Sequence, residues 1–488
     1  MSLVPVVHRP LRPLTWRDLL IADAKQMYSY QEKCADNMFE NPRSGIVVIP
    51  CGGGKTLTGI GMAIAIVCHN KNAAAAAAVA AVAATHGGSG RKVQTRHPQH
   101  VMVVCNTNIV IVQWIKELKK LVKGATDVTG SNHVYVKELK KLVKGATDVP
   151  GSNHVYVKDQ HILFTFTTYH AFSTTRGKGD LCATADVLLL DEVHIAAATS
   201  ASKAIKLFVC DVKIGLTATM LRCDDCVANI ADIVGPTLPE LSVKWKVVEA
   251  SGRIAKLDMR VVTCAASDDW RRMYDESKCT VRRNILNVLN PGKINKVRDI
   301  IAKHPAKKIV IFIDYVTPLE YLKSALKCIA IVGTTNPNER ASMLKLFESA
   351  NAHHNVILLS KVADTGIDIP TAEVVIEMSV IDRSQRQMTQ RVGRGVRINN
   401  SPGKVTYVYT LVNEGTQEYD FWKTRKQFLE SEEYTFTSEV YSDATPCADF
   451  SSVVSEIRAE DGDGVLGVGD VADDVPAKKR KTAHVALV

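Results

Sequence analysis

A glycine-rich turn that follows an apolar run is the first stretch of this sequence that could do chemistry. Residues 44–58 read SGIVVIPCGGGKTLT. Gly52, Gly53 and Gly54 let the backbone aim several N–H groups at one anion, because no Cβ obstructs a tight wrap. Lys55 adds a mobile positive charge, and Thr56 adds a hydroxyl that can ligate Mg²⁺. The stretch is a shortened P-loop and predicts that the chain binds a nucleotide phosphate together with Mg²⁺.

Two acidic residues follow a second apolar run, LLLDEVH. Ligands of open parallel sheets bind outside the carboxyl ends of the strands, so Asp191 and Glu192 are expected to lie near the glycine-rich turn. Asp191 is placed to hold the metal through water, and Glu192 to orient and deprotonate the water that attacks the γ-phosphate. An ordinary acidic strand end is the alternative, and the upstream turn argues against it.

A third motif, QMTQRVGRGVR, lies in the second half of the chain. Positions three apart share one face of a helix, so Arg394 and Arg397, with Gln390 before them, can reach a common anion. Two guanidinium groups at a transferring phosphoryl group act as arginine fingers. A basic surface helix is the alternative reading. The preceding stretch ILLSKVADTGIDIPTAEVVI, a strand followed by an acidic loop, favours the catalytic one.

Alternating apolar strands and helical patterns must position these motifs. Strand candidates include HVMVVCN, ILFTFTTYH, VLLLDEVH, VKIGLTAT, KIVIFID, NVILLS, EVVIEM and TYVYTLV. The spacing between them suits crossover helices and indicates parallel α/β sheets. The pattern occurs twice, before and after a short helical segment at about 268–290. The fold class is therefore α/β, with two parallel-sheet domains.

Composition agrees with an intracellular protein that binds polyanions. The chain has 488 residues, which is more than one domain, and a net charge of +10. Residues 1–17 contain no sustained apolar core of a signal peptide, and the 12 cysteines are scattered as in reduced proteins. No membrane association is expected.

Two segments look added to the compact core. Residues 72–92 begin as an alanine-rich, low-complexity insertion that should project as a loop or helix. Lys116–Val136 is repeated at once as Lys137–Val157, with Thr129 replaced by Pro150. Two copies are too few for a solenoid, so we interpret the repeat at 116–157 as a recent duplication or an assembly error.

The chain resembles superfamily 2 helicases, and specifically the XPB family. Matching stretches run in family order from Tyr30 to about Phe428: RSGIVVIPCGGGKTL, VVCNTNIVIVQW, FTTYHAF, LLLDEVH, KIGLTATMLR, GRIAKLDMRVV, LNPGKINKVRDII, KIVIFIDYVTPLEYL, ILLSKVADTGIDIPTAEVVIEMS, RQMTQRVGRGVR and TQEYDFWKTRKQFL. The resemblance implies an ATP-dependent DNA helicase or translocase that acts on duplex DNA in nucleotide excision repair or transcription initiation. It also implies two RecA-like domains, at 30–249 and 250–430, after an N-terminal extension at 1–29.

The resemblance assigns roles to further residues. Gln31 would contact adenine, Asp368 the ribose, and Thr217 and Thr219 would couple the ATP state to DNA grip. His194 would communicate between the two domains. The expected DNA path contains Asn106, Gln113, Thr168, Ser360 and Lys361. Arg222 and Asp224 remain of the family's Arg-Glu-Asp element, whose central carboxylate is replaced by Cys223, and the segment 268–290 would be a short thumb.

The partners and the mode of action follow from the same resemblance. Duplex DNA should be bound without regard to sequence, since no base-reading module is visible. TFIIH-type subunits are implied as further partners, although the family's N-terminal docking region has no match in this sequence. The small thumb and altered element favour translocation over processive unwinding. Alternatives are a DEAD-box-like RNA helicase and a nucleotide-gated DNA-binding scaffold with little catalysis.

The last segment predicts a nuclear protein. Residues 431–488 form an acidic, glycine-containing tail that is expected to be disordered and that contains PAKKRK at 476–481. A basic cluster in such a tail is typical of a nuclear localisation signal. A solubilising tail and a nonspecific DNA-binding arm are the alternatives.

Overall fold

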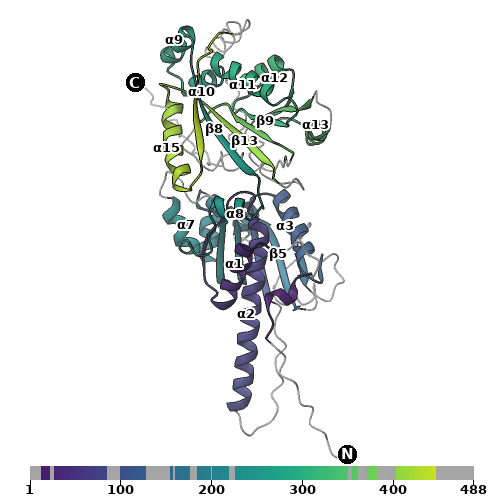
Figure 1. The fold of residues 1–488 in the computed structure, drawn as a ribbon. Helices are drawn as coiled ribbons and strands as arrows, with labels where there is room; N and C mark the ends of the chain where they lie inside the picture. Colours follow the sequence, from purple (N-terminus) through teal and green to yellow (C-terminus); the bar gives the residue numbers. More distant parts are fainter. Residues whose placement is uncertain are drawn as a thin grey trace, which may run out of the picture.

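Two lobes, each built on one sheet, are stacked along the long axis of the molecule in the computed structural model (Figure 1). The structure describes residues 13–21, 27–84, 99–127, 154–157, 160–175, 184–198, 201–218, 226–349, 354–360, 369, 371–381, 391 and 403–446. Within these ranges the helices and strands alternate twice, as the sequence predicts.

The first sheet has seven strands in the order β1-β7-β6-β2-β5-β4-β3. Its strands are β1 (Gly45–Val48), β2 (Gln99–Cys105), β3 (Ala125–Asp127), β4 (His154–Val157), β5 (Ile162–Thr168), β6 (Thr184–Asp191) and β7 (Val209–Thr217). The pairs from β1 to β5 are parallel, whereas β4 runs antiparallel to both β5 and β3. Because β1, β7 and β6 are parallel neighbours, their carboxyl ends meet at one edge.

Helices flank this sheet and connect its strands. They are α1 (Ser29–Glu40), α2 (Lys55–Ala84), α3 (Asn108–Leu121), α5 (Tyr169–Thr175), α6 (Ala201–Leu207), α7 (Cys226–Val234) and α8 (Trp245–Ala250), with the 3₁₀ turns η1 (Trp16–Leu19) and η3 (Val193–Ala198). Trp16 and Leu19 are buried in the same core as β1 and α2. The core of the first lobe thus includes residues before the expected boundary at residue 30.

Helix α2 extends well beyond the sheet that it begins beside (Figure 1). The expected alanine-rich insertion continues this helix as far as Ala84, and its described side chains from Ala73 to Ala77 are exposed. Alanine has the highest helix propensity, which explains why the helix continues through these exposed alanines. None of the described helices is both long and apolar enough to cross a bilayer.

The second sheet also has seven strands, in the order β10-β11-β9-β12-β13-β8-β14, and every pair in it is parallel among the described residues. Its strands are β8 (Lys256–Cys264), β9 (Ile309–Phe312), β10 (Ile329–Ile331), β11 (Val356–Leu359), β12 (Val374–Glu377), β13 (Val405–Asn413) and β14 (Phe436–Tyr441). Its helices are α9 (Asp268–Glu276), α10 (Thr280–Val288), α11 (Pro291–Lys303), α12 (Val316–Leu326), α13 (Pro337–Glu348) and α15 (Gln417–Ser431).

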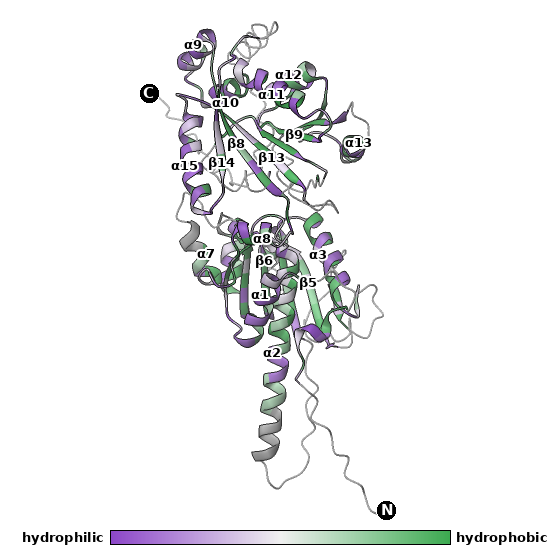
Figure 2. Ribbon diagram, in the orientation of Figure 1, coloured by the Kyte–Doolittle hydropathy of each residue, from purple (hydrophilic) through white to green (hydrophobic). Residues whose placement is uncertain are grey.

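Two features of the second lobe bear on the expected boundaries. Strand β14 belongs to the sheet, so ordered structure passes the expected end at residue 430 and the expected tail at 431–488 begins with a packed strand. The segment 268–290 forms the helical pair α9 and α10, whose Trp270 and Tyr274 are buried against Leu286 and Leu289. Apolar residues concentrate in the strands, while α9 and α15 are largely hydrophilic (Figure 2).

Candidate functional site

The glycine-rich turn connects β1 to α2 and has the geometry of a phosphate cradle. Gly52 and Gly54 both have φ near +80°, a conformation that side-chain-bearing residues rarely adopt. Gly53 donates its N–H to the Pro50 carbonyl at 2.9 Å, and a Cβ at Gly53 would lie 2.9 Å from the same oxygen. The turn therefore requires glycine for its tight wrap, as the sequence predicted, and it opens directly into the first turn of α2.

Lys55 and Glu192 meet at this turn. Lys55 Nζ, at the start of α2, lies 3.0 Å from Oε1 of Glu192, which follows β6, although the two residues are far apart in the sequence. Asp191 is the last residue of β6, and Glu192 follows it with φ of 50°. A left-handed conformation at a residue other than glycine stores strain, which is common at functional sites. The structure thus brings the predicted Lys55, Asp191 and Glu192 together.

In this group the neighbouring carboxylates of Asp191 and Glu192 lie beside the ammonium group of Lys55, and the three charges shift one another's pKa values. Burial raises the pKa of Asp191 to about 6, and the charge of Glu192 adds to this effect, while Lys55 opposes it. Burial alone would lower the pKa of Lys55, but Glu192 and Asp191 outweigh it and hold that pKa above its ordinary value. Lys55 is therefore charged, and the carboxylates favour additional positive charge nearby.

Two aromatic residues that sequence reasoning missed hold Asp191 in place. The indole Nε1–H of Trp114, from α3, donates to Asp191 Oδ2 at 3.0 Å. The hydroxyl of Tyr169, the first residue of α5, donates to the Asp191 carbonyl at 2.8 Å. Gly59 in α2 makes room for the indole, since a Cβ there would lie 2.8 Å from the Trp114 ring. Trp114 stands at the end of the quoted VVCNTNIVIVQW, but nothing in that pattern names its partner.

Gln31 lies against the glycine-rich turn rather than open to solvent. Its side chain is fully buried, and its Nε2 donates to the carbonyl oxygens of Gly53 at 3.2 Å and Gly54 at 3.4 Å. Its Oε1 accepts from the backbone N–H of Tyr28 at 3.0 Å. These contacts give Gln31 a role in positioning the turn, whereas the adenine contact stays a prediction.

His194 and Thr217 connect the acidic strand end with β7. His194 Nδ1 lies 3.0 Å from Thr217 Oγ1 and 3.4 Å from Glu192 Oε2. Thr217 is fully buried at the end of β7, in register with Val48 of β1. Both residues thus lie at the edge that carries the glycine-rich turn. These two contacts are within the first lobe, and communication between lobes stays a prediction for His194.

The predicted DNA-path residues of the first lobe are Asn106, Gln113 and Thr168. Asn106 follows β2 and is exposed, as is Gln113 on α3. Thr168 ends β5, and its hydroxyl accepts from the Ala171 N–H at 3.2 Å, which starts α5. Ser360 follows β11 in the second lobe and is buried. Lys361, Thr219, Arg222, Asp224, Asp368, Gln390, Arg394 and Arg397 lie outside the described residues.

Arg391, which precedes the predicted arginine fingers, is described and buried. Its guanidinium forms an ion pair with Asp314, approaches Glu377 at 3.8 Å and lies over the ring of Phe312 at 5.0 Å. Glu377 also pairs with Arg425 of α15 at 3.0 Å. The stretch QMTQRVGRGVR contains this residue, yet its anchoring role could not be read from the motif because its partners lie far away in sequence.

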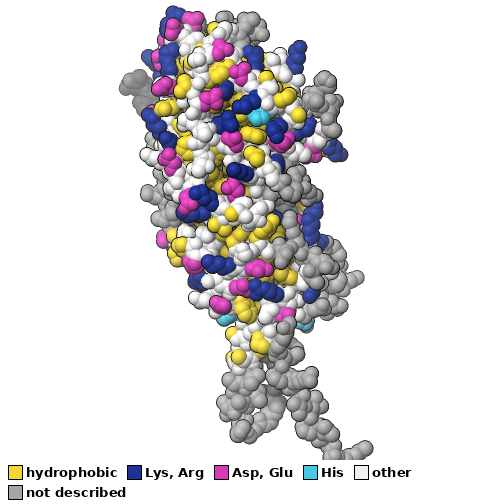
Figure 3. Space-filling model, viewed as in Figure 1, with side chains coloured by type: hydrophobic (Ala, Val, Ile, Leu, Met, Phe, Trp, Pro, Cys, Tyr) yellow, Lys and Arg dark blue, Asp and Glu magenta, His cyan; other side chains and the backbone are white. Residues whose placement is uncertain are grey.

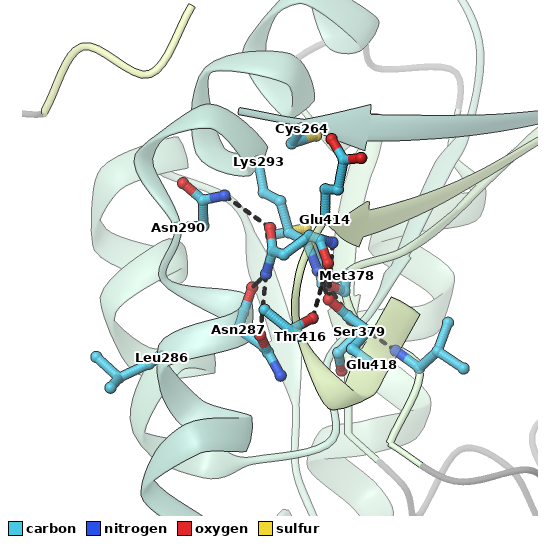
Figure 4. Close-up of polar contacts among 12 residues, drawn as sticks. Cys264, Leu286, Asn287, Asn290, Lys293, Met378, Ser379, Glu414, Thr416 and Glu418 are labelled. Carbon is cyan, nitrogen blue, oxygen red and sulfur yellow. Dashed lines mark hydrogen bonds and ion pairs between the residues drawn. The ribbon is translucent and has the colours of Figure 1, made fainter. Parts of the chain in front are cut away.

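A second buried network holds the end of β12, the strand that precedes Arg391 in the sequence (Figure 4). Lys293 Nζ donates to Glu418 Oε2 at 2.8 Å and to the Met378 carbonyl at 2.7 Å. Glu418 in turn accepts from the backbone N–H of Val380 at 2.8 Å. The side-chain amide of Asn413 donates to Asn287 Oδ1 at 3.1 Å and so ties α10 to the same cluster.

Comparison with protein families finds two models that together cover most of the chain. Residues 248–479 match the ERCC3/RAD25/XPB C-terminal helicase, and residues 24–222 match the Type III restriction enzyme, res subunit. The two matches divide the chain between the lobes, close to the position where α8 leads into β8.

Two curated relatives align with most of this chain. The chain is 33% identical over 425 residues to the general transcription and DNA repair factor IIH helicase/translocase subunit XPB of Encephalitozoon cuniculi, covering 84% of this chain and 55% of that protein. It is 28% identical over 429 residues to the subunit XPB/SSL2 of Saccharomyces cerevisiae, covering 86% and 45%. The chain therefore spans about half the length of the curated relatives it matches.

A solved structure supports the fold. The DNA-bound ATP-dependent Type ISP restriction-modification enzyme LlaBIII aligns with a TM-score of 0.57 at 14% identity, covering 90% of this chain and 33% of that one. This likeness concerns the fold of two RecA-like lobes. The two family models and the relatives at about 30% identity place the chain in the XPB family of superfamily 2 helicases.

Proposed function

We propose that the chain is an ATP-dependent DNA translocase or helicase that acts on duplex DNA in nucleotide excision repair, transcription initiation or both. The observation that carries the proposal is the contact of Lys55 with Glu192 beside Asp191, at the edge where the glycine-rich turn opens. The names of the relatives support the choice of DNA repair and transcription.

The residues present fit Mg²⁺. Carboxylate and hydroxyl oxygens are the donors that this ion prefers, and burial and the neighbouring Glu192 carboxylate raise the pKa of Asp191 to about 6, so added positive charge would stabilise its ionised form. Asp191 and Thr56 would hold the ion, which supplies charge neutralisation at the phosphate oxygens when bound. Glu192 takes the proton of the attacking water, and Lys55 moves from Glu192 to the phosphates.

The second lobe would complete the site. We assign Gln390, Arg394 and Arg397 to it, with Asp368 at the ribose, and the anchoring of Arg391 beside Asp314 and Glu377 supports this assignment. Arginine fingers contribute about 10³ to 10⁵ in rate. Arg394→Ala should therefore abolish DNA-stimulated ATP hydrolysis and leave ATP binding nearly intact, whereas robust turnover by this variant would contradict the assignment.

Duplex translocation with weak strand separation is the mode we propose. The helical pair α9 and α10 is short, and Cys223 stands where the family has a carboxylate. Triplex displacement should exceed fork unwinding in matched assays, and efficient unwinding without triplex displacement would reverse this order. Stimulation of the ATPase by RNA rather than duplex DNA would point to an RNA helicase.

Partners and localisation are part of the proposal. Basic and acidic side chains are interspersed on the face in Figure 3, so no single-signed surface on that view marks a DNA path. We propose a nuclear protein whose basic cluster at 476–481 is its import signal and whose partners include TFIIH-type subunits. Replacing Lys478, Lys479, Arg480 and Lys481 with alanine should shift a tagged protein to the cytoplasm, and affinity purification should recover TFIIH subunits.

A further inference from the structure

Basic side chains gather at the amino-terminal edge of the second sheet. They come from β8, from the end of α11 and from the residues that precede β9 and β13. Burial lowers the pKa of Lys404 to about 8, and Lys307 lowers it further, so these two side chains lie close together. We call this group the basic edge, and its members are Lys256, Arg260, Lys303, Lys307 and Lys404.

His304 is buried beside the basic edge and responds to its charge. Burial lowers the pKa of His304, and Lys303, Lys307 and Arg260 each lower it further, while Asp258 opposes them. Cations that disfavour a positive charge at this position favour a negative one by the same interaction. The basic edge therefore attracts anionic groups.

Carboxylates of the second lobe offset only part of this charge. Asp258 pairs with Arg260 at 2.9 Å, and Glu373 pairs with Lys307 at 2.9 Å. Glu439 of β14 also acts on Arg260. The five cations of the basic edge thus exceed the three carboxylates that contact them in the described part of the lobe.

The sequence that follows the second lobe carries the opposite charge. In a chain with a net charge of +10, residues 449–474 contain eight carboxylates and one arginine. We call this stretch the acidic segment. Its charged residues are Asp449, Glu456, Arg458, Glu460, Asp461, Asp463, Asp470, Asp473 and Asp474.

The chain approaches the acidic segment alongside α11. Asn295 Nδ2, in the second turn of this helix, donates to the Thr445 carbonyl at 3.0 Å. The helix continues from there to Lys303 over about 12 Å. Each extended residue spans about 3.3 Å, so the connection from Thr445 is long enough for Glu456 and the acids after it to reach the basic edge.

We propose that the acidic segment binds the basic edge of its own second lobe. Exposed ion pairs are individually weak, but a short tether holds the segment at an effective concentration in the millimolar range. The basic edge also lies at the opposite end of the strands from Ser360, the expected DNA-path residue that follows β11. The bound segment neutralises this surface and keeps other polyanions from it.

Carbodiimide cross-linking of the full chain tests the contact, because this reagent joins a carboxylate to an amine only where the two touch. Mass spectrometry should find the acidic segment joined to Lys303, Lys307 or Lys404 at low salt. The yield should fall several-fold at about 0.5 M salt, since screening weakens exposed pairs. Lys323 and Lys423, exposed on α12 and α15, are the matched controls. Equal yields at the controls would overturn the proposal.

Cleavage at Arg458 by an arginine-specific protease provides a second readout. Lys303→Glu with Lys404→Glu should speed this cleavage by about 3- to 30-fold, because the released segment is open to the protease. Lys323→Glu with Lys423→Glu changes the net charge equally and should leave the rate unchanged. Equal acceleration by both double variants would reveal a general charge effect and overturn the proposal.

Charge exchange completes the test. Adding Asp461→Lys and Asp463→Lys to the basic-edge double variant should restore slow cleavage, whereas continued fast cleavage would contradict the proposal. Basic-edge lysines that resist acetylation only after duplex DNA is added would assign the surface to a DNA backbone instead. None of these measurements requires nucleotide hydrolysis, so their outcome is independent of the proposed function.

Discussion

Lys293 and Glu418 form an ion pair with almost no exposed surface, at 0% and 1% of the side chains. Removing two charges from water is costly. The pair is tolerated because the Met378 carbonyl accepts a further hydrogen bond from Lys293, and two backbone N–H groups donate to the Glu418 carboxylate. Burial raises the pKa of Glu418, although Lys293 opposes this. The pair thus fixes the end of β12 only while both partners are present.

Lys293→Met should lower the free energy of unfolding by about 3–5 kcal/mol, because it leaves the Glu418 carboxylate buried and uncompensated. The double variant Lys293→Met with Glu418→Gln should lose less, since no buried charge remains. Urea unfolding of the full chain measures both.

Lys423→Met is the matched control, since Lys423 pairs with Asp420 at 3.2 Å but is 60% exposed. Exposed pairs contribute about 0–1 kcal/mol. Equal losses for the buried and exposed variants would show that the network in Figure 4 does not hold the strand end.

Single residues of the site differed in how far the sequence revealed them. Lys55, Asp191 and Glu192 were predictable because each belongs to a local motif whose chemistry is fixed by residue type. Trp114 was not, because its function depends on a partner that only the fold brings near. Gln31 was identified as a site residue, but its partners in the turn were not.

At the scale of elements, the repeated segment gives one strand from each copy. β3 comes from the first copy and β4 from the second, and they pair with Ala125 opposite Val157. The residues between them, 128–153, lie outside the described part of the chain. Ala146–Asp148 and His133–Val136 repeat the sequences of β3 and β4, so one copy contains everything that the pair requires.

Deleting residues 128–148 should therefore leave the fold and the ATPase unchanged. The deletion joins Asp127 to Val149 and leaves one intact copy with a short Pro-Gly-containing connection. The shorter loop should stabilise the protein by about 1 kcal/mol through loop-closure entropy. Thermal unfolding and ATPase assays test this, and loss of activity in a folded deletion protein would show that the second copy has a function.

Two histidines connect four strands of the first sheet. His154 Nδ1 of β4 lies 3.1 Å from Thr165 Oγ1 of β5, which lies 2.9 Å from His100 Nε2 of β2. His100 Nδ1 reaches the Thr184 carbonyl of β6 at 3.2 Å. Burial lowers the pKa of His100 to about 4, so His100 is neutral near pH 7, and with Nδ1–H donating to the Thr184 carbonyl its Nε2 accepts from the Thr165 hydroxyl.

Stability should fall as the pH drops through the range in which these histidines would charge. Burial lowers the pKa of His100 to about 4 and also lowers that of His154, while an unfolded histidine titrates at about 6.5. Between these values the unfolded chain binds protons that the folded one does not, so the stability is present above about pH 6.5 and lost toward about pH 4.

Melting temperatures measured from about pH 7 to about pH 5 test this dependence. His100→Gln should flatten the slope, whereas His170→Gln, on exposed surface of α5, should leave it unchanged. An unaltered slope in His100→Gln would assign the acid sensitivity elsewhere.

Elements were predictable where the sequence pattern is long and apolar. All eight quoted strand candidates occur in the sheets, because buried parallel strands read as continuous apolar runs. The edge strands β3, β10 and β14 were not anticipated, since short or exposed edge strands have little apolar signal. The domain limits stay a prediction, and η1 and β14 pack on the two lobes outside the predicted range of 30–430.

At the scale of the whole molecule, the lobes meet around α8. Trp245 packs on Tyr434 at 5.3 Å, and Tyr30 of the first lobe belongs to the same apolar cluster as Met259 and Val261 of β8. The glycine-rich turn lies at this junction, where Arg253 touches it. The turn is therefore in direct contact with the segment that joins the lobes, so a change in the conformation of the turn would act on that segment.

The central claim is that the Lys55, Asp191 and Glu192 group hydrolyses ATP for movement on DNA. The most direct test is ATP hydrolysis by the full chain, with and without duplex DNA, in the wild type and in Glu192→Gln. Glutamine can still accept from Lys55 but cannot take a proton, so hydrolysis should fall by about 10²- to 10⁴-fold while ATP binding persists. Duplex DNA should stimulate the wild type. DNA-stimulated hydrolysis that survives in Glu192→Gln would contradict the account.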